Sequence, residues 1–214
     1  MSRASPSATL ESVLTIAGSD SSGGAGIQAD LRTFAALQVH GCSAITAVTA
    51  QNTQGVRSVL ALPPSLVAEQ IDAVLDDIRV ATIKIGMLAN AAIVVAVAKE
   101  LAKTAVPVVL DPVMVAKGGS ALLEEDAVAA LKAQLLPRAT LVTPNLPEAE
   151  RLVGFPVRTV AEQEQAAKAL CAAGAGACLV KGGHAYGDPV DVLCDGKETL
   201  HYKATRMRTR TCWS

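Results

Sequence analysis

Short apolar segments that alternate with helical patterns most constrain the fold of this chain. Segments rich in Val, Ile and Leu stop at glycine or polar residues, and stretches with apolar side chains every three or four positions follow them. Such strands are typical of a mostly parallel sheet covered by helices on both faces. The predicted strand ends carry six polar or glycine signals: Gly18-Ser19-Asp20, Gln51-Asn52, Gly86-Met87, Asp111-Pro112, Asn145 and Lys181-Gly182-Gly183. Because ligands of open α/β sheets bind outside the carboxyl ends of the strands, we predict one α/β domain with a site at that edge.

Residues 13–30 predict the first strand, a glycine-rich turn and the start of a helix. The turn at 24–29 reads GAGIQA and fits the dinucleotide pattern G-x-G-x-x-A, which also requires an acidic residue about 20 positions later. The sequence has no Asp or Glu between Asp30 and Glu69, so NAD-type binding loses its confirming feature. The P-loop pattern G-x-x-x-x-G-K-[ST] is also absent from the sequence, which excludes a P-loop NTPase.

Composition and charge bear on the partners of the chain. Half of its 214 residues are hydrophobic, only 2% are aromatic, and the formal net charge is −1. A nearly neutral chain has no general field that attracts nucleic acid or anionic lipid. The longest strongly apolar run, 91–98, is far too short to span a bilayer. We therefore expect a small-molecule substrate, with neither a nucleic-acid partner nor a membrane association.

The cysteines and the N-terminal residues indicate a compartment. None of the five cysteines forms a C-x-x-C pair, and the three histidines do not cluster with them, so neither a disulfide framework nor a zinc site is supported. Most of them are expected to be small buried hydrophobes in a reducing cytosol. Residues 1–12 lack the apolar core of a secretory signal. We expect a cytoplasmic protein with a disordered lead-in, or alternatively a remnant of an organelle-targeting segment.

Four charged residues are candidates for chemistry. Asp30 borders the buried stripe of its helix, which favours a functional role over a simple interaction with the helix dipole. Glu148 alone would be more typical of a first helical turn, but together with Asp111 at an adjacent strand end it suits a hydrated Mg²⁺. Lys181, before two glycines, is suited to a phosphate, or is a strand-end lysine with its ammonium in solvent.

Several sequence blocks resemble those of the hydroxymethylpyrimidine/phosphomethylpyrimidine kinases, thiamine-biosynthesis enzymes of the ribokinase-like superfamily. The blocks occur in the family's order between about residues 13 and 202. They are VLTIAGSDSSGGAGIQAD at 13–30, TAQNT at 49–53, KIGML at 84–88, VLDPVM at 109–114, TPNLPEA at 143–149 and KGGH at 181–184. The resemblance implies a three-layer α/β/α sandwich with a mostly parallel central sheet, and it suggests a homodimer.

The resemblance also implies a role for each matched position at the pyrimidine end of the site. Gly18, through its backbone, and Asp30 and Gln51, through their side chains, would bind the amino and ring-nitrogen edge of the pyrimidine. Met87 and Val113 would pack against the ring.

At the other end, the resemblance implies a site for ATP and Mg²⁺. Asp111, Asn145 and Lys181 would bind ATP, and Asp111 and Glu148 would hold Mg²⁺ largely through water. The reaction would move the γ-phosphoryl group of ATP to the 5-hydroxymethyl oxygen and then to the monophosphate.

The chain departs from the family near its end. The family continues into a Thr-His-Gly-Thr-Gly-Cys segment that opens a further helix, forms the anion hole and places a catalytic cysteine. Here residues 205–214 read TRMRTRTCWS, in which Cys212 is a partial counterpart of that cysteine. We expect a lead-in at 1–12, a kinase domain at 13–203 and a divergent basic tail at 204–214, with the C-terminal helices missing and turnover weak or absent. The alternatives are a pyridoxal-type kinase of the same superfamily and a non-catalytic pyrimidine-binding protein.

Overall fold

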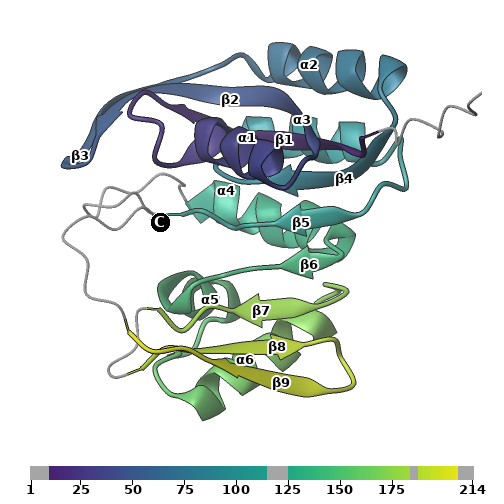
Figure 1. Cartoon of the computed structure of the whole chain (residues 1–214). Helices are drawn as coiled ribbons and strands as arrows, with labels where there is room; N and C mark the ends of the chain where they lie inside the picture. Colours follow the sequence, from purple (N-terminus) through teal and green to yellow (C-terminus); the bar gives the residue numbers. More distant parts are fainter. Residues whose placement is uncertain (1–9, 115–124, 184–187, 207–214) are drawn as a thin grey trace, which may run out of the picture.

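A nine-stranded sheet runs through the computed structural model, which describes residues 10–114, 125–183 and 188–206 (Figure 1). The strand order is β3-β2-β1-β4-β5-β6-β7-β8-β9. The strands are β1 (Ser12–Asp20), β2 (His40–Asn52), β3 (Gly55–Ala61), β4 (Val80–Ile85), β5 (Val108–Leu110), β6 (Leu141–Val142), β7 (Cys178–Val180), β8 (Val190–Cys194) and β9 (Thr199–Lys203). The six strands from β2 to β7 in this order are parallel, whereas β3, β8 and β9 pair antiparallel to their neighbours. The predicted mostly parallel sheet is therefore confirmed.

Helices lie on both faces of this sheet. They are α1 (Gly26–Ala36), α2 (Pro64–Asp77), α3 (Ala91–Leu101), α4 (Glu125–Ala130), α5 (Leu146–Val153) and α6 (Val160–Ala172). The chain moves from β1 to β2 in one direction, and from β4 through β7 in the other, so right-handed crossovers put α1 on one face and the later helices on the opposite face. Figure 1 shows α1 in front of β1, with α3 and α4 behind the sheet. The three layers agree with the predicted α/β/α sandwich.

The core lies between the sheet and the layer of later helices. Alternate strand residues such as Ile16, Ile83 and Leu110 are fully buried there with Val97 of α3. Aliphatic side chains make up most of this core, as the low aromatic content requires. In the described part of the chain, α1 is the one helix on the other face, where it packs on β1 and β2.

The helical segment that begins with α4 is irregular in its second half. A π-helical turn (Leu131–Leu135) and a 3₁₀ turn (Leu136–Arg138) follow α4, because Pro137 cannot continue an α-helical ladder. The strands β8 and β9 form a hairpin around Asp195 and Gly196. Among the described residues, no helix is long and apolar enough to cross a membrane.

Candidate active site

The carboxyl end of β1 holds the first group of predicted site residues. β1 lies between β2 and β4, and the connections after β1 and β4 run in opposite directions, so this is the switch point at which open α/β sheets bind their ligands. A Cβ atom on Gly18 would lie only 2.5 Å from Cε of Met87, so these two residues are in contact across the strand ends. Met87 is held in turn because Thr46 Oγ1 donates a 2.6 Å hydrogen bond to its carbonyl oxygen.

The backbone amides of the glycine-rich turn are bound by a carboxylate of the same turn. The carboxylate of Asp20 accepts hydrogen bonds from the backbone amides of Ser22, Gly24 and Ala25, at 2.8–2.9 Å. Burial alone would raise the pKa of Asp20, but the hydrogen bonds from Ser22, Ala25 and Gly24 together lower it below its usual value. Since those amides are already used, this turn does not offer them to a phosphate.

Gln51 sits beside the same turn at the end of β2. The backbone of Gln51 exchanges two hydrogen bonds with the hydroxyl of Ser21, of 2.7 and 2.8 Å. Thr49 Oγ1 lies 3.3 Å from the side-chain oxygen of Gln51 and also donates to the carbonyl of Ser19. Gln51 is thereby held beside Ser21 and Thr49 at the ends of β1 and β2.

Asp30 projects from α1 toward β1 and β4. Its Oδ2 atom accepts a hydrogen bond of 2.6 Å from Thr15 Oγ1 and lies 2.9 Å from the ammonium of Lys84. Thr15 and Lys84 are register partners on β1 and β4, so both reach the same carboxylate. Sequence reasoning assigned no role to Lys84. The available signal was a lysine inside the apolar strand VATIKI.

The second group lies at the ends of β5, β6 and β7. Lys181 Nζ lies 2.9 Å from Oδ1 of Asp111, and Thr143 Oγ1 lies 3.2 Å from the same oxygen. Sequence reasoning missed the contact of Thr143, which follows β6 directly. Gly182 is required beside Lys181, because a Cβ there would collide with the carbonyl oxygen of Val190.

Asn145 and Glu148 join this group through a helix cap. The Asn145 side chain accepts from the amide of Glu148, and Oε2 of Glu148 accepts from the amide of Asn145, so the pair forms the capping box of α5. Burial raises the pKa of Glu148 from 4.5 to about 7, and the negative charge of Asp111 adds to this rise. The hydrogen bond from Asn145 and the charge of Lys181 oppose it only in part. The group thus has two carboxylates and one ammonium, so it carries a net negative charge once Glu148 is ionised.

This charge is suited to a cation that keeps most of its own water. In the described residues, no group of three or more His, Cys, Asp or Glu side chains is arranged to hold a metal ion. Asp111 and Glu148 supply two carboxylates, which fits the way Mg²⁺ is bound by one or two carboxylates together with substrate phosphates. The donor set thus fits hydrated Mg²⁺ and does not fit a cage made of protein ligands alone.

Two predicted site residues remain, Val113 and Cys212. Val113 is partly buried just after β5, where its amide donates a hydrogen bond to the carbonyl of Asp111. Cys212 lies outside the described residues.

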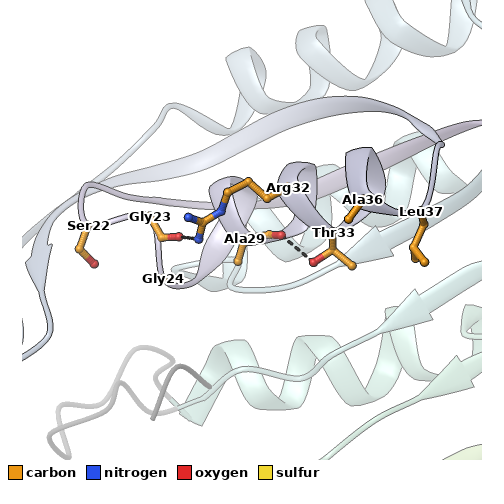
Figure 2. Close-up of a pocket in the computed structure, with 8 residues that line it drawn as sticks. All are labelled: Ser22, Gly23, Gly24, Ala29, Arg32, Thr33, Ala36 and Leu37. Atoms are coloured by element: carbon orange, nitrogen blue, oxygen red, sulfur yellow. Dashed lines mark hydrogen bonds between the residues drawn. The ribbon is translucent and has the colours of Figure 1, made fainter. Parts of the chain in front are cut away.

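A hollow of about 660 Å³ lies along α1 and the glycine-rich turn (Figure 2). Its lining residues are Ser22, Gly23, Gly24, Ala29, Arg32, Thr33, Ala36 and Leu37. The predicted site residues are not among them. Its polar groups already bond to one another, Arg32 to the carbonyl of Gly23 and Thr33 to that of Ala29 (Figure 2). We therefore place the candidate site at the strand ends and not in this hollow.

Comparisons with known proteins show which family this chain resembles. Residues 20–212 match the model of a family described as phosphomethylpyrimidine kinase. A hydroxymethylpyrimidine/phosphomethylpyrimidine kinase of Streptomyces coelicolor is 48% identical over 210 residues, which cover 98% of this chain and 78% of that protein. The crystal structure of a phosphomethylpyrimidine kinase from Clostridium difficile superposes with a TM-score of 0.85 at 42% identity, over 91% of this chain and 84% of that one. An ADP complex of Bacillus subtilis pyridoxal kinase has the same TM-score at 36% identity, over 94% and 77% of the two chains.

Proposed function

Since this chain belongs to the phosphomethylpyrimidine kinase family, we propose that it phosphorylates 4-amino-5-hydroxymethyl-2-methylpyrimidine and its monophosphate with ATP, in thiamine biosynthesis. The observation that carries the proposal is the pair of polar groups at one edge of a ribokinase-like sheet. One is built around Gly18, Asp30, Gln51 and Met87, and the other around Asp111 and Lys181. An acceptor substrate and a triphosphate need two such adjacent regions, one for each.

The first group has the hydrogen-bonding chemistry of an aminopyrimidine edge. The Asp30 carboxylate accepts hydrogen bonds, which suits the exocyclic amine. The Gln51 amide can donate to a ring nitrogen, and the Gly18 backbone offers further polar atoms beside it. Met87 and Val113 supply apolar surface for the flat ring. Together these residues would orient the 5-hydroxymethyl group toward the second group.

The second group has the chemistry of a triphosphate site. We propose that Asp111 and Glu148 hold hydrated Mg²⁺, and that Asn145 and Lys181 bind ATP with Asp111. Bound Mg²⁺ supplies neutralisation of the phosphate charge. Lys181 contributes a further positive charge, and the Asn145–Glu148 capping box fixes the direction of the carboxylate. Phosphoryl transfer depends mainly on alignment and charge neutralisation, which these residues can provide.

An ADP-release assay on the whole chain tests the proposal. We expect weak Mg²⁺-dependent ADP release with the aminopyrimidine and still less with pyridoxal, the substrate of the alternative kinase. Faster release with pyridoxal would contradict the proposal. Stabilisation by the aminopyrimidine without any ADP release would instead favour a non-catalytic binding protein. The same assay tests the expectation of weak turnover.

We also propose a homodimer and a cytoplasmic location. The register partners Val48 and Leu60 on β2 and β3 are 46% and 68% exposed, and such apolar pairs favour protein contacts. We expect Leu60→Glu to lower the mass measured by light scattering, while Leu200→Glu on the opposite edge strand leaves it unchanged. A monomeric wild type would contradict the proposal of a homodimer.

The four described cysteines are free thiols, which suits the proposed cytoplasmic location, a reducing compartment.

A further inference from the structure

The ion pair between Lys84 and Asp30 is the least expected feature of the sheet face under α1. Lys84 belongs to the strand VATIKI, and its side chain is only 23% exposed, while that of Asp30 is 17% exposed. Thr15, the third member, is fully buried. A charged pair this far from solvent loses much of its hydration, and apolar residues of similar volume are often as stabilising or more so. The stability of the fold therefore does not explain why this pair is present.

The two donors leave one carboxylate oxygen for another partner. Both Thr15 Oγ1 and Lys84 Nζ reach Oδ2 of Asp30, at 2.6 and 2.9 Å. Within the described part of the chain, no hydrogen bond reaches Oδ1 of Asp30. Two fixed donors on one oxygen define the plane and the direction of the carboxylate, so Oδ1 is a preorganised acceptor.

Lys84 also lies next to the pyrimidine end of the candidate site. A Cβ atom on Gly86 would lie 3.0 Å from Lys84 Nζ and 3.1 Å from Cβ of Ala17. Gly86 therefore leaves the room that the ammonium occupies, directly before Met87, whose side chain covers Gly18. The lysine connects α1, β1 and β4 near the carboxyl ends of the two strands.

We propose that Lys84 is a positioning residue that sets the selectivity of the site for a ring bearing an amino group. This inference rests on the proposed function. Held by Lys84 and Thr15, Asp30 presents Oδ1 only as an acceptor, so it matches the N–H of a 4-amino group. A 4-oxo ring presents an acceptor at that position, and two acceptors facing each other across a desolvated contact disfavour binding. Lys84 thus acts on specificity through Asp30 without touching the reacting atoms.

The test is calorimetric binding of the amino substrate and its 4-oxo analogue to wild type, Lys84→Met and Lys84→Arg. In Lys84→Met we expect amino-substrate binding to weaken about tenfold, the loss of roughly one charge-assisted hydrogen bond, and the amino-over-oxo preference to narrow by a similar factor. The affinity for a non-hydrolysable ATP analogue is expected to stay within about twofold, because the second group is untouched. Lys84→Arg should restore most of the preference. Lys103→Met is the matched control, since it removes an exposed lysine that pairs with Asp72 and Glu100 far from the strand ends.

The outcomes separate the inference from the proposed function. A lower melting temperature of Lys84→Met with an unchanged amino-over-oxo preference would show a merely structural role and overturn the inference. If Lys84→Met does not fold, Lys84→Gln removes the charge and keeps a polar side chain, and an unchanged preference in that variant overturns the inference equally. Wild type that binds the amino ring without releasing ADP contradicts the proposed function alone, and the binding ratios still decide the role of Lys84. Wild type that binds neither ring overturns both.

Discussion

Replacing Glu148 by Gln is expected to stabilise the metal-free chain at alkaline pH. Glu148 is 6% exposed, and burial raises its pKa from 4.5 to about 7. In the unfolded chain the group loses its proton near pH 4.5, whereas in the folded chain it keeps the proton until about pH 7. The folded state therefore loses stability as the pH rises between these two pKa values. Above them, the free energy of unfolding is lower by about 3 kcal/mol in total. A neutral glutamine retains an acceptor for the Asn145 amide and avoids this cost.

Urea unfolding followed by circular dichroism, without Mg²⁺, measures the effect. The stability difference between Glu148→Gln and wild type is expected to change in favour of the variant by about 2 kcal/mol between pH 5 and pH 8. Adding Mg²⁺ at pH 8 should stabilise the wild type more than the variant, because the proposed site for the ion includes the Glu148 carboxylate. A difference that is constant with pH, or that moves toward the wild type as the pH rises, would refute the reasoning.

Glu162 is the matched control for this prediction. It occupies the same capping-box position in α6 that Glu148 occupies in α5, but it is only partly buried. Hydrogen bonds from the backbone amides of Arg158 and Thr159 lower the pKa of Glu162, so its contribution to stability is present above the unfolded pKa and is lost as the pH falls. Glu162→Gln should therefore destabilise the chain at neutral pH, and the difference should shrink in acid, with the sign opposite to Glu148→Gln.

Two further predictions concern the strand ends. Asp111→Asn removes the anion partner of Lys181. Calorimetry should show that Mg²⁺-dependent binding of an ATP analogue weakens at least about tenfold, while the affinity for the pyrimidine is unchanged. Equal losses of affinity for both ligands would contradict the division of the site into two groups. Gly26→Ala should lower the free energy of unfolding, measured in urea, by about 2 kcal/mol or more. Gly26 has a φ of 56°, and a Cβ there would collide with the carbonyl oxygen of Gly18. Gly183→Ala is the control, since a Cβ there meets nothing within 4 Å, and a similar cost at both positions would argue against the steric reasoning.

The sequence by itself determined the fold class and the edge of the sheet that carries the site. Both follow from local patterns: apolar strands in alternation with helices indicate a parallel sheet, and a parallel sheet places all its carboxyl ends together. The residues at those ends, from Gly18 to Lys181, could therefore be assigned to one edge, and sequence blocks shared with a known family suggested their roles.

Only the tertiary structure decided which side chains share a contact. The turn at 20–25 looks in sequence like a place for a phosphate, but the fold returns the Asp20 carboxylate onto its amides. Lys84 reads in sequence as an irregularity within a buried strand, and it pairs with Asp30 because β4 lies beside β1 with α1 above them, 54 residues away along the chain. The pKa of Glu148 likewise depends on burial and on Asp111 from another strand end. Local patterns determine elements, whereas hydrogen bonds and charge pairs between distant segments depend on register and packing, which no local pattern records.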